Sequence, residues 1–462
     1  MKPKYFLALG LLVLGLGSCG ESFFEQYPSN NITEGNFYKT DDDFNQGVVA
    51  CYAKLKTQMS FHLTEIGYRG DENVLESMAV STQNRYDIDH FAETANNGIL
   101  NDIWNAWYNG IYRCNDVLDH MTGAKIANYD KYRGECLFLR SWWYFNLYRV
   151  FGVVPITRTV VTPAAAKLIP RCTEEEMYTL LTEDLAEAAR LLPPTPGPEK
   201  ARVANIAAYT LLAKVYLTFG KPAEAKTALE EAMKNTSYGL ESTTKKVFDV
   251  GNKMNREIIF ALYYNKTNDN GHGYWYSANT DVLADINNPT PTFKAIYDSE
   301  KDNRLPLISS YTKIKDNLFA MTKWYDTYDA TYTTQVGNDF PHLRYADVVL
   351  MYAEALAESG GSLGDALEWL NKTRTRAGLD ELTTDEVKSL AEFRRELAAE
   401  RGREFALEGH RWFDLVRLGL AVDYFREMGY SLDSHNLIFP IPQSQIEIVN
   451  NPSILWQNPG FN

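Results

Sequence analysis

Apolar residues recur at helical spacing over much of the chain. In residues 40–59, 101–121 and 130–151 they return every three or four positions, which is the pattern of a helix with a buried face. The third segment is apolar nearly all round and stops at Gly152, a residue type that commonly ends helices. We therefore predict that it is a buried central helix, whose aromatic side chains belong to the core.

Helix pairs are predicted further along the chain. Thr173 and Glu176 have the spacing of a capping box and open another helical segment. Residues 212–232 then place small and large apolar side chains at the offsets of a tetratricopeptide unit, in which two antiparallel helices pack closely. Residues 343–359 and 363–375 fit the same template. Because at least about three such units are needed for a stable stack, the upstream helices should supply the others.

The pattern changes between these two helix pairs, over residues 236–340. Gly, Asn, Asp, Pro and Thr become frequent, strand-like runs are short, and Tyr and Trp are dense. A loop-rich segment of this length inside a compact protein is usually functional. We predict an irregular ligand-binding subdomain with short strands, inserted into a mainly α array.

The N-terminus carries an export signal. Two lysines precede an apolar stretch of 12 residues at 5–16, which as a helix is about 18 Å long and too short for the roughly 30 Å hydrocarbon core of a membrane. The following Leu16-Gly-Ser-Cys19 resembles the lipobox of bacterial lipoproteins, whose cysteine is lipidated before cleavage. We predict a signal peptide over residues 1–18 and a lipid anchor on Cys19 that tethers the protein to a membrane.

Composition and cysteine usage narrow the chemistry. A net charge of -14 and a pI near 5.1, without a compact Lys/Arg stripe, exclude nucleic acid as a partner. Cys51, Cys114 and Cys136 lie among helix-periodic apolar residues, where buried inert thiols are common. The four cysteines after Cys19 also allow two disulfides in an oxidising compartment. Without a CxxC motif or clustered histidines, we predict no metal site and no cofactor.

Ordered sequence blocks in the last third identify a family. They resemble the signature blocks of the SusD/RagB family, and an upstream block at 137–152 matches as well. One departure is Gln445, where the family often has an acidic residue. The blocks are LRYADVVLMYAEA at 343–355, LNKTRTRAG at 370–378, ERGREFALEGHRWFDLVR at 400–417, FPIPQSQI at 439–446, and the ending QNPGF at 457–461.

This resemblance implies about four tetratricopeptide-like helix pairs beside an irregular ligand-binding half, and no catalysis. It implies a lipoprotein of the outer membrane that faces the exterior and caps a SusC-like TonB-dependent transporter like a lid. The implied ligand is a glycan or, as in the RagB branch, a peptide. The predicted division is a signal peptide at 1–18, a helical region at 19–235, the insert at 236–340 and the signature region at 341–462.

An enzyme hypothesis would start at residues 400–414. Glu400, Glu404 and Glu408 are spaced four apart, and His410 and Asp414 share a helix face, so a carboxylate pair for glycan hydrolysis is conceivable. Like charges in an Arg-rich helix more often form ion pairs that fix helix packing. We predict a structural network and no catalytic residue. Besides the binding lipoprotein and the surface hydrolase, a third alternative is a plain tetratricopeptide scaffold for another protein.

Aromatic pairs in the insert are the first candidates for ligand binding. Trp275-Tyr276 and Trp324-Tyr325 lie among polar loop residues, and the faces of such rings pack against sugar rings. The alternative is that one ring of each pair fills the core beneath the loops. Asn84 and Arg85 lie between two early helices, where the resemblance implies further ligand contacts. Aromatic loops favour a glycan modestly, although Tyr-rich surfaces also bind peptides.

Overall fold

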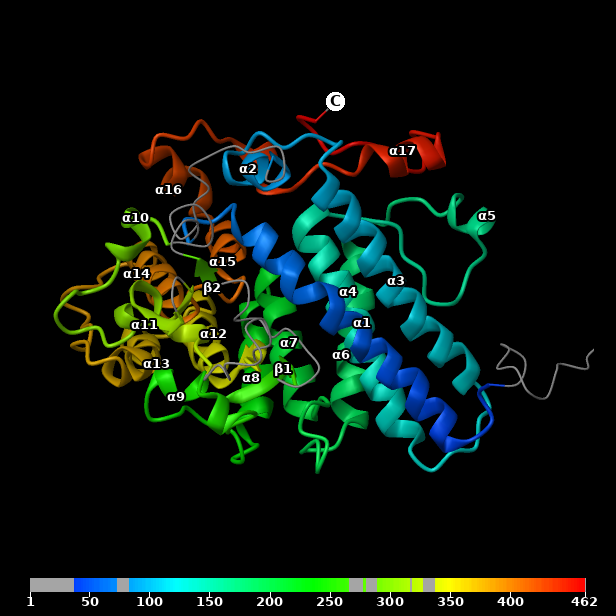
Figure 1. Ribbon diagram of the computed structural model, residues 1–462, viewed down its shortest axis with the longest axis horizontal. Helices are drawn as coiled ribbons and strands as arrows, with labels where there is room; N and C mark the ends of the chain where they lie inside the picture. Colours follow the sequence, from blue (N-terminus) through cyan, green and yellow to red (C-terminus); the bar gives the residue numbers. More distant parts are fainter. Residues whose placement is uncertain are drawn as a thin grey trace, which may run out of the picture.

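Helices build most of the molecule (Figure 1). The computed structural model describes residues 37–72, 83–265, 277–279, 289–315, 318–326 and 337–461. The longer helices are α1 (Asp41–Gly67), α3 (Gly98–Met121), α4 (Tyr129–Phe151), α6 (Glu174–Leu191), α7 (Asn205–Thr218), α8 (Pro222–Met233), α12 (Tyr345–Glu358), α13 (Leu363–Arg376) and α14 (Leu390–Glu404). The shorter ones are α2 (Gln83–Asp89), α5 (Pro163–Ala166), α9 (Thr244–Val247), α10 (Pro291–Lys294), α11 (Leu305–Ser309), α15 (Arg411–Arg417), α16 (Ala421–Glu427), α17 (Gln443–Val449) and the 3-10 turns η2 (Val250–Asn252), η4 (Thr322–Trp324) and η5 (Ser434–Leu437).

Local caps explain why several helix ends agree with the sequence pattern. At the start of α6, the Thr173 hydroxyl accepts the backbone N–H of Glu176, whose carboxylate accepts the N–H of Thr173. Thr40 and Asp43 form the same capping box at α1. α4 ends at Gly152 with φ 72°, a conformation that strains any residue with a side chain.

Successive helices pack against one another and form a continuous array. α3 packs on α4, α4 on α6, α6 on α7 and α7 on α8. α8 then packs on α12, although residues 234–344 separate these two helices in the sequence. We call residues 234–344 the central segment. It is inserted between two parts of the helical array that are in direct contact with each other. The α7/α8 and α12/α13 pairs correspond to the helix pairs that the sequence predicts.

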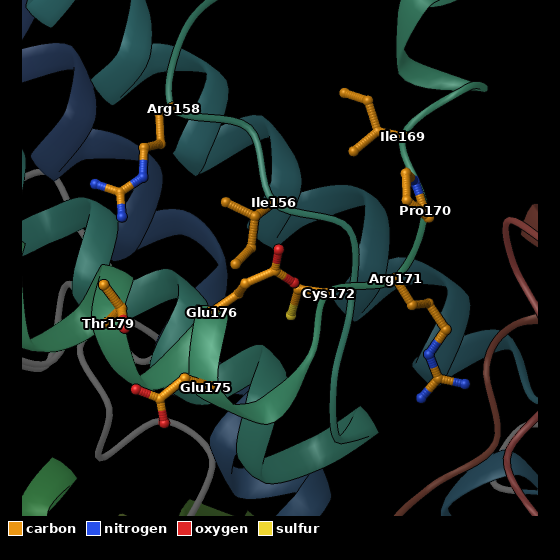
Figure 2. A pocket seen from close by; sticks show the side chains of 9 residues that line it. All are labelled: Ile156, Arg158, Ile169, Pro170, Arg171, Cys172, Glu175, Glu176 and Thr179. Atoms are coloured by element: carbon orange, nitrogen blue, oxygen red, sulfur yellow. The ribbon is translucent and has the colours of Figure 1, made fainter.

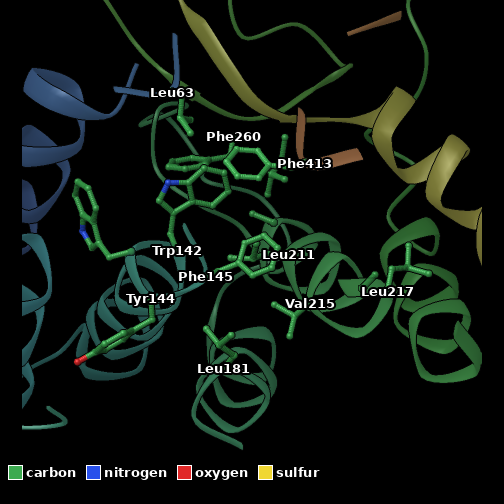
Figure 3. Packing of buried hydrophobic residues seen from close by; sticks show 14 of the residues in the cluster. Leu63, Trp142, Tyr144, Phe145, Leu181, Leu211, Val215, Leu217, Phe260 and Phe413 are labelled. Atoms are coloured by element: carbon green, nitrogen blue, oxygen red, sulfur yellow. The ribbon is translucent and has the colours of Figure 1, made fainter. Parts of the chain in front are cut away.

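The core lies where α4 meets α6, α7 and the first strand of the central segment (Figure 3). Trp142 and Phe145 are buried, as are most of their neighbours along α4, so the predicted buried central helix is confirmed. The Trp142 indole packs edge-on against Phe260 at a centroid distance of 5.7 Å. On the other side, a methyl group at Gly110 would overlap the indole of Trp143, so this glycine allows α3 to approach α4 closely.

Two paired strands, near the two ends of the central segment, form what we call its base. β1 (Ile258–Leu262) and β5 (Phe340–Arg344) are antiparallel and wholly buried. They lie near the two ends of the segment, so their pairing holds these ends together against the helices. A second, antiparallel sheet has the order β2-β4-β3 and consists of β2 (Ser277–Asn279), β3 (Tyr311–Lys315) and β4 (Leu318–Met321).

A buried ion network joins this base to the C-terminal helices. Arg344, at the end of β5, forms ion pairs with Glu257 at 2.7 Å, Glu404 at 2.6 Å and Glu408 at 2.9 Å. Arg376, at the end of α13, pairs with Glu257 and Glu404. The network thus connects the paired strands to the ends of α13 and α14.

A second arginine extends the network into the central segment. Arg304 forms ion pairs with Asp302 at 2.9 Å, Glu400 at 2.7 Å and Glu404 at 3.0 Å. Burial by itself raises the pKa of Glu404, but the adjacent arginines hold it well below its usual range. A carboxylate held ionised by three arginines is not available as a general acid. The arrangement supports the structural interpretation of residues 400–414.

The four cysteines in the described part of the chain, Cys51, Cys114, Cys136 and Cys172, are buried and free. Of the two possibilities that the sequence allows for these four cysteines, the structure shows buried free thiols and not two disulfides. Among the helices that the structure describes, none combines the length and the apolarity required to cross a membrane.

We expect Glu404→Gln to lower the free energy of unfolding by about 3–5 kcal/mol, because it removes the charge that compensates buried Arg344 and Arg376. Chemical denaturation at pH 7 measures this change. Glu427→Gln is the matched control, because Glu427 is exposed on α16. Unchanged stability of Glu404→Gln, together with loss of a glycan-cleaving activity, would favour the hydrolase hypothesis instead.

Candidate functional site

The structure describes four of the six predicted ligand-binding residues. Trp275 and Tyr276 lie outside the described residues, as does Cys19. The other four lie on two elements: Trp324 and Tyr325 follow β4, and Asn84 and Arg85 belong to α2.

The prediction that the Trp324 ring is exposed and stacks on a ligand is wrong. Its side chain is 0% exposed and packs edge-on against Phe248 at a centroid distance of 5.1 Å. Next to it, the Lys323 ammonium pairs with Glu408 at 2.8 Å, so the buried ion network holds this turn inward. Trp324 is therefore the core-filling member of its aromatic pair. Its neighbour Tyr325 is half-buried and stays a candidate.

Asn84 and Arg85 lie at the protein surface on α2. Asn84 is exposed, and its backbone carbonyl accepts a hydrogen bond from the Asn97 amide at 2.9 Å. The partly exposed Arg85 pairs with Glu65 of α1 at 3.2 Å. Burial raises the pKa of Glu65 to about 7, although Arg85 favours its ionised form. Arg85 is thus oriented by a buried carboxyl group.

A stacked ring pair on α2 was not among the predicted site residues. Tyr86 and His90 are four residues apart, half-buried, and stack with ring centroids 3.8 Å apart. Their spacing places them on one helix face, and that is the signal in the sequence that indicates the pair. We call Asn84, Arg85, Tyr86 and His90 the α2 surface. It combines aromatic, amide and guanidinium groups, which suit recognition of a ring bearing hydroxyl groups.

The central segment contacts the chain between α1 and α2. The hydroxyl of Thr290 donates a hydrogen bond of 2.9 Å to the carbonyl of Asp71, which follows the end of α1. The α2 surface itself packs on α1 and α3.

A second aromatic surface lies along α3, in a groove of about 370 Å³. Trp104, Tyr108 and Tyr112 follow one another at four-residue spacing and line it, and Tyr112 is 42% exposed. At the edge of the groove, the side-chain amide of Gln445 donates a hydrogen bond of 3.2 Å to the side-chain oxygen of Asn105. We call this the α3 groove. Sequence analysis missed it, because α3, the loop at 155–169 and α17 contribute its lining from distant positions.

A second hollow, of about 430 Å³, lies beside the start of α6, and Figure 2 shows the residues that line it. Arg158 and Arg171 lie at opposite ends of it, and Cys172 lies between them. Glu176 is engaged in the α6 cap, which lowers its pKa through hydrogen bonds from Thr173. Since no histidine lines this hollow and one of its two carboxylates is committed to a cap, the lining holds no acid–base pair.

Within the ranges that the structure describes, no group of three or more His, Cys, Asp or Glu side chains is arranged to hold a metal ion.

We expect Trp324→Ala to lower the free energy of unfolding by about 3–5 kcal/mol, because it empties a large buried volume. Thermal and chemical denaturation measure the loss. Tyr325→Ala, at the adjacent half-buried position, should cost less and serves as the control. A Trp324→Ala protein of wild-type stability would contradict the core assignment.

Comparison with known proteins identifies similar sequences and folds. The model of the SusD family matches residues 303–461, and a model described as starch-binding associating with outer membrane matches residues 27–217. SusD-like protein P2 of Formosa agariphila is 25% identical, with 99% of this chain and 100% of that protein aligned.

Solved structures agree with these matches. A SusD superfamily protein of Bacteroides vulgatus has a TM-score of 0.76 at 23% identity, covering 92% of this chain and 100% of that one. Surface glycan-binding protein A of Bacteroides thetaiotaomicron, solved in complex with laminarihexaose, has a TM-score of 0.75 at 22% identity, covering 91% of this chain and 100% of that one. The predicted mainly α fold with tetratricopeptide-like pairs is confirmed.

Proposed function

This chain belongs to the SusD family, and on that premise we propose that it is a surface lipoprotein that binds an oligosaccharide for uptake. The family is one of non-catalytic binding proteins. The observation that carries the proposal is the similarity over nearly the whole chain to a protein solved with laminarihexaose. Delivery to a SusC-like TonB-dependent transporter, with this protein as the lid, completes the proposed role.

The α2 surface and the aromatic residues of the central segment are the proposed glycan site. Sugar rings stack on aromatic faces, while amide and guanidinium groups bind paired hydroxyls. The Tyr86–His90 pair, Asn84 and Arg85 supply both kinds of group. Trp275, Tyr276 and Tyr325 are the proposed contributions of the central segment. A peptide is the alternative ligand.

We expect Trp275→Ala to weaken oligosaccharide binding by about 1–3 kcal/mol, the contribution of one ring stacked on a flat ligand. Calorimetry on the soluble protein without residues 1–19 measures this, after a screen of laminarin-derived and other glycans beside a peptide library. Trp456→Ala is the matched control, because this indole is 41% exposed but lies outside the central segment. Stability should barely change in either variant.

The same titrations distinguish the two aromatic surfaces. Tyr112→Ala alters the α3 groove and leaves the α2 surface unchanged. The affinity of this variant for the oligosaccharide should therefore equal that of the wild type. If Trp275→Ala binds normally while Tyr112→Ala does not, the glycan site is the α3 groove. If neither variant differs from the wild type, Arg85→Ala tests the α2 surface by itself. Binding of peptides alone would replace the glycan proposal.

We expect Cys19→Ala to leave a folded protein that no longer fractionates with membranes, because the anchor is proposed to be the acyl chains on that cysteine. Fractionation of cells and immunoblotting measure the distribution. Ser18→Ala, which keeps a small residue before the cysteine, should leave the protein in the membrane fraction. Retention of the Cys19→Ala protein in washed membranes would contradict lipid anchoring at this residue.

A further inference from the structure

A cavity of about 290 Å³ lies between the end of α4, α7 and α15, away from both aromatic surfaces. Its deepest lining residues, such as Phe145 and Lys214, are buried, whereas those nearer solvent, such as Tyr148 and Val416, are half-buried. The lining residues are Phe145, Tyr148, Arg149, Gly152, Lys214, Thr218, His410, Phe413, Asp414, Val416, Arg417, Leu437 and Ile438. The cavity therefore combines apolar walls with several charged groups.

Positive charge exceeds negative charge around this cavity. The cations are Arg149, Lys214, Arg401 and Arg417, and the carboxylates paired among them are Asp347, Glu354 and Asp414. Burial and the nearby Lys214 hold the pKa of His410 well below its ordinary value, so this ring is neutral. One cation is thus left without a countercharge.

Arg149 is that cation. In the described part of the chain its guanidinium donates one hydrogen bond, to the Asn146 side chain, and forms no ion pair. Its Nε is buried without a hydrogen-bond partner. The guanidinium lies over the rings of Phe145 at 4.7 Å and Phe413 at 3.9 Å, which fix its plane. Burial lowers the pKa of Arg149 to about 9, although the charges of Asp414 and Asp347 favour its ionised form.

The carboxylate on the cavity wall does not supply the missing charge. Asp414 pairs with Arg401 at 2.7 Å and with Arg417 at 3.0 Å. Lys214 is likewise committed to Asp347. An anion entering the cavity would therefore meet Arg149 as its available partner, while the charge of Asp414 is already compensated.

We propose that this cavity binds a small organic carboxylate, held by Arg149. A guanidinium presents a planar fork that matches a carboxylate, and Phe145 and Phe413 hold this fork in one orientation. Phe413, Val416, Leu437 and Ile438 offer an apolar surface to the body of the ligand. The volume is near the lower end of small-molecule sites, so the ligand is compact. This inference does not depend on glycan binding.

Benzoate is the probe for a test by calorimetry, with benzamide as its neutral isostere and sodium chloride and sulfate at equal ionic strength. We expect the mature protein to bind benzoate and not benzamide. Arg149→Met should weaken benzoate binding by about tenfold or more, because a charge-assisted pair is lost. Arg113→Met is the matched control, since Arg113 is exposed on α3 and its loss changes the net charge equally.

A second variant keeps the test decisive if Arg149→Met fails to fold. Val416→Trp narrows the half-buried side of the cavity while leaving every charged group in place, and it should also reduce benzoate binding. Crystals soaked with 4-bromobenzoate should show anomalous scattering between Phe413 and Ile438. An acetylated dipeptide with a free or an amidated C-terminus distinguishes a peptide terminus from a free acid as the source of the carboxylate.

Any of the following results would overturn the proposal. They are absence of benzoate binding by the wild-type protein, equal binding of benzoate and benzamide, undiminished binding by a folded Arg149→Met protein, and undiminished binding by Val416→Trp if Arg149→Met does not fold. Binding of chloride or sulfate as tightly as benzoate would likewise refute an organic carboxylate as the ligand.

Discussion

The position of Arg344 constrains how the two halves of the molecule fit together. This residue is 1% exposed, and burying a guanidinium costs free energy unless carboxylates compensate its charge. The carboxylates come from Glu257 before β1 and from Glu404 and Glu408 at and after the end of α14. Since none of these elements can move away without leaving a buried charge unpaired, the network holds the base of the central segment on the C-terminal helices.

That constraint divides the protein into a helical framework and an irregular central segment. The helical array is continuous from α3 to α8 and resumes at α12, so it can carry the central segment without depending on the internal structure of that segment. The paired strands β1 and β5 and the ion network close the segment at its base. Such an arrangement allows the loops of the central segment to change without disturbing the helices that carry them.

The aromatic pair Trp324-Tyr325 shows the limit of reasoning from the sequence. Its polar neighbours indicate a loop, but the depth of a side chain depends on what covers it. Lys323 is held by Glu408, a residue 85 positions away, and this contact turns Trp324 into the core. The α3 groove shows the same limit, because α17 and the loop at 155–169 meet α3 only in the folded protein. No local pattern reports such contacts.

The sequence by itself determined the helices, the capping box at Thr173, the helix pairs, the irregular central segment and the family, because these depend on local periodicity and on ordered motifs. It also indicated that the charges at 400–414 are structural, since an Arg-rich helix face favours ion pairs. The tertiary structure alone decided which aromatic rings are exposed, which buried carboxylate orients Arg85, and that Arg149 lacks a countercharge. Exposure and charge compensation are properties of groups brought together from distant positions, so they exist only once the chain has folded.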